Sequence, residues 1–148
     1  MKKSILYSLF IALGLSNIGC HFTQNETTIT QETYNKMLQQ TFMLTPDSLM
    51  TLEQLELKLK VMDYLYENII IDDCNLKLSQ PREDMERHNI PSIYYDVITY
   101  QLKEIPQFLN KEGATTIHIS LQEMWHESSE RYWRDERDIL SSLIEAKR

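Results

Sequence analysis

Apolar residues recur at helical spacing through most of the chain, and four segments carry the pattern. The first segment follows a Thr28…Gln31 capping pattern, and its inward positions are Tyr34, Met37, Leu38 and Phe42. The second segment begins at Thr45, with Pro46 at the first helical position and Asp47 near the positive end of the helix dipole. The pattern therefore predicts two helices joined by a short connection.

The second segment is apolar over a wide arc. Spacings of three and four residues join a first stripe made of Leu52, Leu55, Leu59, Met62, Tyr66 and Ile69. A second stripe on another face consists of Met50, Leu57, Val61 and Tyr64. Charges gather on one remaining arc, at Glu53, Glu56, Lys60, Asp63 and Glu67. We expect the central helix of a bundle, covered on more than one side, with a partner-facing surface as the alternative for the second stripe.

Periodicity breaks between residues 71 and 80, and a third helical region then opens at Pro81 and restarts at Pro91. Its buried stripe consists of Ile93, Tyr94, Val97, Ile98, Leu102, Ile105 and Leu109. Pro106 predicts a kink in this helix, because proline lacks the backbone N–H that the helix needs. Gly113 predicts a left-handed cap that ends it.

The last segment starts at a Ser120…Glu123 capping box and extends toward the C-terminus. One face carries Leu121, Trp125, Tyr132, Ile139 and Leu143, and the opposite, solvated face carries Glu127, Glu130, Arg131, Arg134 and Asp138. The four segments together predict an all-α fold, a small antiparallel bundle of about four helices in a single domain over residues 28–148.

The first twenty residues follow a different pattern. Lys2 and Lys3 precede a mostly apolar run over residues 5–15, and small or polar residues then lead to Gly19 and Cys20. An apolar run this short is typical of a secretory signal, since a membrane span needs about 20 apolar residues. The Gly19-Cys20 pair resembles the lipobox of bacterial lipoproteins, although Asn17 stands where that family usually has Leu or another aliphatic residue.

The lipoprotein resemblance implies that residues 1–19 are a signal peptide, that Cys20 is lipidated, and that residues 20–27 form a tether. The chain would be exported and anchored to the bacterial cell envelope, and His21 in place of Asp after the cysteine favours the outer membrane. The tether spans at most about 28 Å, so the domain would stay close to the membrane. An ordinary signal peptide with a coincidental cysteine and an uncleaved anchor are the alternatives.

Composition narrows the possible functions. The chain has 15 basic and 22 acidic residues and a formal net charge of −7, and loss of Lys2 and Lys3 with the signal would leave −9. An acidic chain repels phosphate backbones, so we expect no binding to nucleic acid. Gly113 is the one glycine after the predicted signal, which disfavours glycine-dependent phosphate loops and nucleophile elbows.

The sequence contains no motif that indicates catalysis, a cofactor or a metal. Glu123 and His126 form an E-x-x-H, but a di-iron site needs a second copy and two further carboxylates. His126 and Glu127 lack the second histidine of a zinc protease helix. Cys74 follows two aspartates that disfavour its thiolate, so we expect it to be buried and inert. The chain is thus predicted not to be an enzyme.

Aromatic residues are numerous for a helical domain of this size. Tyrosine and tryptophan dominate binding hot spots when exposed and fill cores otherwise. Tyr95 and Trp133 are the two that we expect at the surface as partner contacts. The second stripe of the central helix, Met50, Leu57, Val61 and Tyr64, is the other candidate surface.

These features favour a membrane-anchored lipoprotein that binds an envelope protein, as an accessory or structural subunit of an assembly such as a secretion apparatus. The alternative is an immunity-type lipoprotein that neutralises a toxin or an envelope enzyme, because an acidic surface suits a basic target. A small envelope enzyme or ligand carrier is a third interpretation, and it predicts an apolar pocket with converging polar groups.

Overall fold

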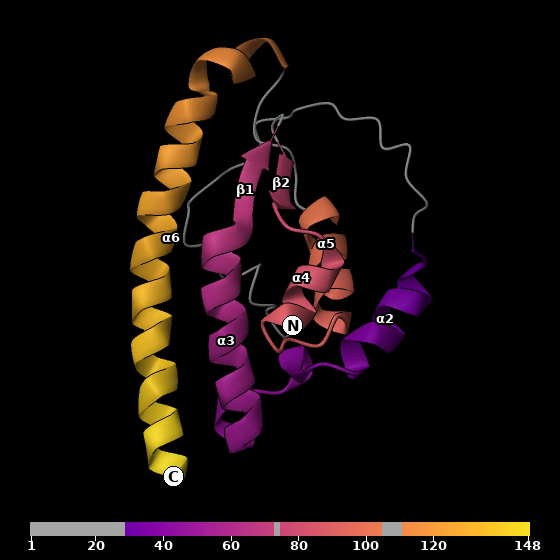
Figure 1. The fold of residues 1–148 in the computed structure, drawn as a ribbon, viewed down its shortest axis with the longest axis vertical. Helices are drawn as coiled ribbons and strands as arrows, with labels where there is room; N and C mark the ends of the chain where they lie inside the picture. Colours follow the sequence, from indigo (N-terminus) through magenta and orange to yellow (C-terminus); the bar gives the residue numbers. More distant parts are fainter. Residues whose placement is uncertain (1–28, 73–74, 105–110) are drawn as a thin grey trace.

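Helix α3 (Leu52–Asn68) lies between the long helix α6 (Lys111–Lys147) on one side and most of the other elements on the other side (Figure 1). The two helices run antiparallel. Arg148 at the end of the chain pairs with Glu56 in the second turn of α3, and the earlier Arg137 pairs with Asp63 further along α3. This arrangement gives α3 the covering on two sides that its wide apolar arc requires.

The computed structural model describes part of the chain. The backbone is described for residues 29–72, 75–104 and 111–148, and the side chains for 29–72, 76–103, 127 and 129–148. The predicted signal and tether, including Cys20, lie outside the described residues. So do Cys74 and Pro106.

Helix α2 (Gln31–Gln39) starts later than the capping pattern predicts. The side chain of Thr30 accepts a hydrogen bond from the backbone N–H of Thr33 and so caps the helix. Helix α2 buries no residue completely, and its apolar side chains Tyr34, Met37 and Leu38 pack partly covered against the core.

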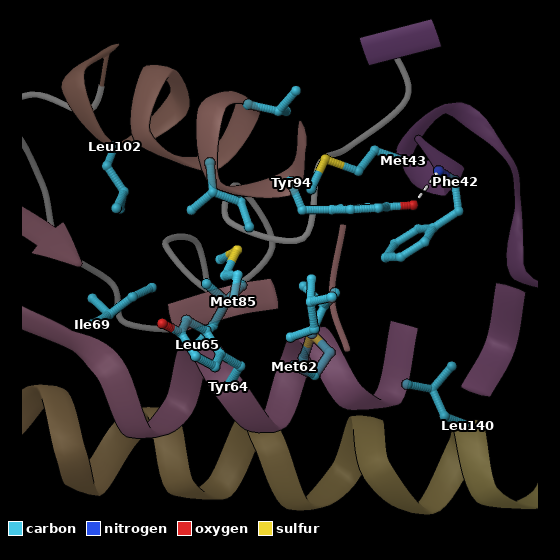
Figure 2. Close-up of a cluster of buried hydrophobic side chains, with 14 of the residues drawn as sticks. Phe42, Met43, Met62, Tyr64, Leu65, Ile69, Met85, Tyr94, Leu102 and Leu140 are labelled. Atoms are coloured by element: carbon cyan, nitrogen blue, oxygen red, sulfur yellow. Dashed lines mark hydrogen bonds between the residues drawn. The ribbon is translucent and has the colours of Figure 1, made fainter. Parts of the chain in front are cut away.

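Phe42 is buried, as predicted, but it lies in the separate 3₁₀ helix η1 (Phe42–Leu44). Its backbone N–H donates a hydrogen bond of 3.0 Å to the phenol oxygen of Tyr94, and the two rings lie 5.0 Å apart (Figure 2). These contacts hold η1 against α5 (Ile93–Glu104).

The predicted start of the central helix at Thr45 and Pro46 is wrong. Pro46 instead precedes a single 3₁₀ turn, η2 (Asp47–Leu49), and α3 begins at Leu52. A capping box between Thr51 and Gln54 sets this later start, with hydrogen bonds of 3.0 and 3.2 Å in the two directions.

A β-hairpin occupies the segment where helical periodicity breaks. Strand β1 (Ile69–Asp72) pairs antiparallel with β2 (Asn75–Leu78), with Ile69 opposite Leu78 and Ile71 opposite Leu76. Ile69 and Ile71 are buried, and the intervening Ile70 is partly exposed, which is the alternation of a strand. The described part of the chain is therefore mostly helical rather than all-α, because three consecutive β-branched residues favour a strand.

The two proline-initiated helices of the third region are confirmed. Helix α4 (Arg82–Arg87) follows Pro81, and α5 follows Pro91. Four positions of the predicted α5 stripe are buried, namely Tyr94, Val97, Ile98 and Leu102.

The predicted inner positions Tyr132 and Leu143 of helix α6 are partly buried against the core, and the five predicted solvated positions are exposed. Helix α6 differs from the prediction in its start and in the position of Ile139. It begins at Lys111, so Gly113 is not a helix-ending cap and Ser120 is not a helix start. A capping pattern permits a helix to start without preventing helical backbone before it. The buried residues of its described part are Ser129, Leu140 and Ile144. Ile139, predicted on the inner face, is 51% exposed because it lies about 100° around the helix from Leu140.

The core is formed mainly by α3, α5, η1 and the hairpin. Its fully buried members include Leu55, Leu65, Ile69, Met85 and Ile98, and Figure 2 shows side chains of α3 and α5 meeting around Met85 of α4. Leu140 and Ile144 join α6 to this core, and Tyr132, Trp133 and Leu143 pack partly buried against it.

Candidate protein-interaction site

Four side chains from α3 and α6 form a compact aromatic and charged group, which we call the Trp133 cluster: Asp63, Tyr66, Trp133 and Arg137. The rings of Tyr66 and Trp133 stack with centroids 5.0 Å apart and an interplanar angle of 19°. The indole N–H of Trp133 donates to Asp63 Oδ1 at 2.8 Å. One guanidinium N–H group of Arg137 donates to both oxygens of Asp63, at 2.6 and 2.7 Å.

Arg137 also covers the ring of Trp133. Its guanidinium carbon lies 5.1 Å from the ring centroid, within the range of a cation–π contact. Every member of the cluster is thus held by another member, while all four side chains remain partly exposed. Such fixed side chains lose little conformational entropy when a partner covers them.

A second polar group, the Lys58 cluster, consists of Asp47, Lys58 and Glu136. Lys58 is 9% exposed, and its ammonium donates to Asp47 Oδ1 at 2.7 Å. Burial raises the pKa of the Glu136 carboxyl, the negative charges of Asp47 and Asp135 raise it further, and the positive charge of Lys58 opposes them. The ion pair between Lys58 and Asp47 joins α3 to η2, and Glu136 of α6 is near enough for both charges to affect its pKa.

A third group ties α3 to α4. The phenol of Tyr64 donates to Asp84 Oδ2 at 2.9 Å, and burial together with this carboxylate raises the pKa of Tyr64. His88 Nδ1 lies 2.8 Å from the backbone oxygen of Asp84, and its ring meets the ring of Tyr64 edge-on. Tyr64 therefore keeps its phenol proton, and the hydrogen bond that this proton makes to Asp84 links α3 to α4.

The candidate residues from the sequence fall into two groups. Met50, Val61 and Tyr64 are 2%, 0% and 3% exposed, so three of the four members of the second stripe pack inside the domain rather than forming a surface. Leu57, Tyr95 and Trp133 are partly buried against the core and keep some exposed surface. Their predicted role as partner contacts stays a prediction, and Trp133 alone of these three lies in a cluster with hydrogen-bonded and stacked partners.

The Lys58 cluster was missed although the sequence contained a signal for it. Lys58 lies one helical turn from both Leu55 and Met62, on the apolar arc of α3. A charged residue in that position must find a partner or leave the core. The partners themselves, Asp47 and Glu136, come from other elements and have no comparable sequence signal.

The candidate metal motif is not described, because the side chains of Glu123 and His126 lie outside the described residues. In the part of the chain that is described, no three His, Cys, Asp or Glu side chains are grouped as metal ligands. Within the same residues, no helix combines the length and the apolar character of a membrane span.

Comparisons with protein family models, curated proteins and solved structures give no match for this chain.

Proposed function

We propose that this chain is a lipid-anchored accessory protein of a bacterial cell-envelope assembly, and that it binds a protein partner through the Trp133 cluster. The observation that carries the proposal is the fixed, partly exposed row of Tyr66, Trp133 and Arg137. Tyrosine, tryptophan and arginine are the residue types most enriched at binding hot spots. The lipobox-like Gly19-Cys20 pair supports attachment to the membrane.

Co-purification from native membranes tests the proposal. The tagged full-length protein is extracted with mild detergent, and the bound proteins are identified by mass spectrometry. We expect a small number of stoichiometric envelope proteins. Recovery of the chain alone would contradict an accessory role.

A double variant, Tyr66→Leu with Arg137→Gln, tests the proposed contact surface. We expect it to lose the partners while it keeps its helix content and its membrane attachment. The matched control is Tyr100→Leu, which breaks the stack between Tyr34 and Tyr100 on α2 and α5, where the centroids are 4.1 Å apart. Equal partner recovery from both variants would place the binding surface elsewhere.

The lipid anchor has a direct test of its own. Cys20→Ala should abolish labelling with a radioactive fatty acid and should release the protein from membranes. Continued labelling of this variant would show that the attachment residue is assigned incorrectly.

An immunity-type inhibitor is the second candidate, and the acidic character of the chain favours it, since 22 acidic residues would suit a basic target. The two functions predict different phenotypes. Deletion of an accessory subunit should impair its assembly under all conditions, whereas deletion of an inhibitor should reduce viability only when the toxin is present.

A further inference from the structure

Helix α2 lies at the edge of the domain against α5, on the side away from α6 (Figure 1). It buries no residue completely, and its apolar side chains Tyr34, Met37 and Leu38 are only partly covered. The next element is held differently, because Phe42 of η1 is 2% exposed and its backbone N–H is bonded to Tyr94. A segment that buries few apolar side chains opens locally before the rest, so α2 should open more readily than η1.

The described side-chain contacts between α2 and α5 lie near the surface. The rings of Tyr34 and Tyr100 stack with centroids 4.1 Å apart and an interplanar angle of 18°. The phenol of Tyr100 donates to Gln31 Oε1 at 3.1 Å, and the side-chain N–H of Gln101 donates to the phenol oxygen of Tyr34 at 2.8 Å. Water can replace both hydrogen bonds when α2 moves away, so losing them costs little free energy.

The docked position of α2 leaves the side-chain amide of Gln101 half satisfied. Its Oε1 atom is buried, and no donor among the described residues is bonded to it. Tyr34 serves one end of the amide in either orientation of the group, so the other end stays unpaired. A buried polar atom without a partner raises the free energy of the docked state, and opening lets water bond to it. Gln101 therefore favours detachment of α2.

We propose that α2 is a strap that detaches from α5 and docks again while the rest of the domain stays folded. A free segment of nine residues is too short to remain helical, so a detached α2 becomes flexible chain. The consequence rests on the proposed function, because α2 follows the predicted tether. The chain between Cys20 and Gln40 then reaches at most about 70 Å, against about 28 Å for the tether alone. Detachment would thus let the domain bind partners farther from the membrane.

Hydrogen–deuterium exchange, followed by mass spectrometry on the full-length protein in detergent, tests the strap. We expect the backbone amides of α2 to exchange about a hundredfold faster than those in the middle of α3, without unfolding of the core. Exchange of α2 at the same rate as α3 would show that it opens only with the whole domain, and would overturn the inference.

The variant Gln101→Met removes the unpaired oxygen and keeps the length of the side chain. We expect it to slow the exchange of α2 about threefold, since the docked state no longer buries an unpaired polar atom. Gln39→Met is the matched control, because it makes the same change at an exposed position of α2 and should leave the rate unaltered. An unchanged or faster rate in the Gln101→Met variant would mean that the amide does not favour detachment, which contradicts the inference.

The variant Tyr100→Leu acts in the opposite direction, because it removes the stacked ring. We expect the exchange of α2 to become about fivefold faster and that of α3 to stay the same. In lipid vesicles, a fluorescent amino acid replaces Lys147 and transfers energy to acceptor-labelled lipids. The transfer should be weaker in the Tyr100→Leu variant, because the domain moves farther from the membrane. Equal transfer with and without this change would overturn the longer reach.

The exchange measurements need no partner, so they separate this inference from the proposed function. Slow exchange of α2 together with co-purified envelope proteins would overturn the strap alone. Fast exchange of α2 together with recovery of the chain without partners would contradict the accessory role and leave the strap standing.

Discussion

Helix α3 is joined to the elements on its two flanks in different ways: Asp63 pairs with Arg137 of α6, and Lys58 pairs with Asp47 of η2. On one flank Arg137 and Asp63 meet at the surface, with side chains 41% and 36% exposed, beside the stacked rings of Tyr66 and Trp133. On the other flank Lys58 and Asp47 form a pair whose side chains are 11% and 31% exposed. On the first flank the charges stay exposed to water, and the stacked aromatic rings hold the two helices together. The second encloses a charge.

The two ion pairs should therefore differ in what they contribute, one to the stability of the fold and the other to the placement of its elements. Exposed ion pairs contribute at most about 1 kcal/mol, so the Trp133 flank should depend mainly on its rings and on the indole hydrogen bond. A buried pair contributes little beyond apolar packing but is costly to break, so the Lys58 flank should tolerate only one placement of η2 against α3.

The largest effect is expected from Asp47→Asn, which leaves the ammonium of Lys58 buried without its carboxylate. We expect the free energy of unfolding to fall by about 2 kcal/mol, less than for a fully buried pair because Asp47 is partly exposed. Urea denaturation measures the change. The double variant Asp47→Asn with Lys58→Met should lie within about 1 kcal/mol of the wild type. If the single variant were as stable as the wild type, the enclosed charge would have no structural role.

A smaller effect is expected from Trp133→Phe, which keeps an aromatic ring but removes the hydrogen bond to Asp63. The cost should be about 1 kcal/mol, since Asp63 retains its contact with Arg137. Tyr66→Phe is the control, because it keeps the stacked ring. Equal losses from the two variants in thermal denaturation would show that the indole N–H does not matter.

Salt concentration should change the contribution of the exposed ion pair to stability but not that of the enclosed one. Arg137→Gln should lower the free energy of unfolding by less than about 1 kcal/mol in 50 mM NaCl, and the loss should shrink toward zero in 1 M NaCl. The effect of Asp47→Asn should persist in 1 M NaCl, because water and ions reach the buried ammonium poorly. Urea titrations at the two salt concentrations give both comparisons, and a parallel salt dependence of the two variants would remove the distinction.

The smallest effect concerns Glu136, whose pKa is raised in the folded state above its ordinary value of 4.5. The stability that its proton contributes is fully present below that ordinary pKa and is lost as the pH rises through the folded value. Glu136→Gln should therefore leave stability unchanged near pH 4 and increase it by a few tenths of a kcal/mol, roughly, at pH 7. Thermal denaturation across this pH range gives the difference. A destabilising effect at pH 7 would mean that attraction to Lys58 outweighs burial.

Helical periodicity predicted the parts of the fold whose residues pack within one face of one element. The stripe of α5 and the two-sided burial of α3 follow from spacing alone. The hairpin was missed because Ile69 fits both the helical stripe and an alternating strand. The start of α6 was missed because Ser120 fits the sequence pattern of a helix N-cap whether or not helical backbone precedes it.

The clusters on the two flanks were harder to predict, because their members are distant in the sequence. Trp133 was identified as a surface aromatic, yet its partner Asp63 is 70 residues away. Ile139 was assigned to the inner face of α6. The buried residue is its neighbour Leu140, which lies about 100° further around the helix. In the Lys58 cluster, Lys58 is the one member that the sequence marks, because it is a charged residue among apolar positions of α3.

The antiparallel pairing of α3 with α6 also determines the order in which this fold can form. Asp63 and Arg137 are 74 positions apart, and Glu56 and Arg148 are 92 apart, so these contacts close long loops. Closing such loops is slow compared with forming a helix or a hairpin. The hairpin and the helices before α6 can associate while the remainder of the chain is still being made. We therefore expect the face of α3 that α6 covers to stay exposed to water until late in folding.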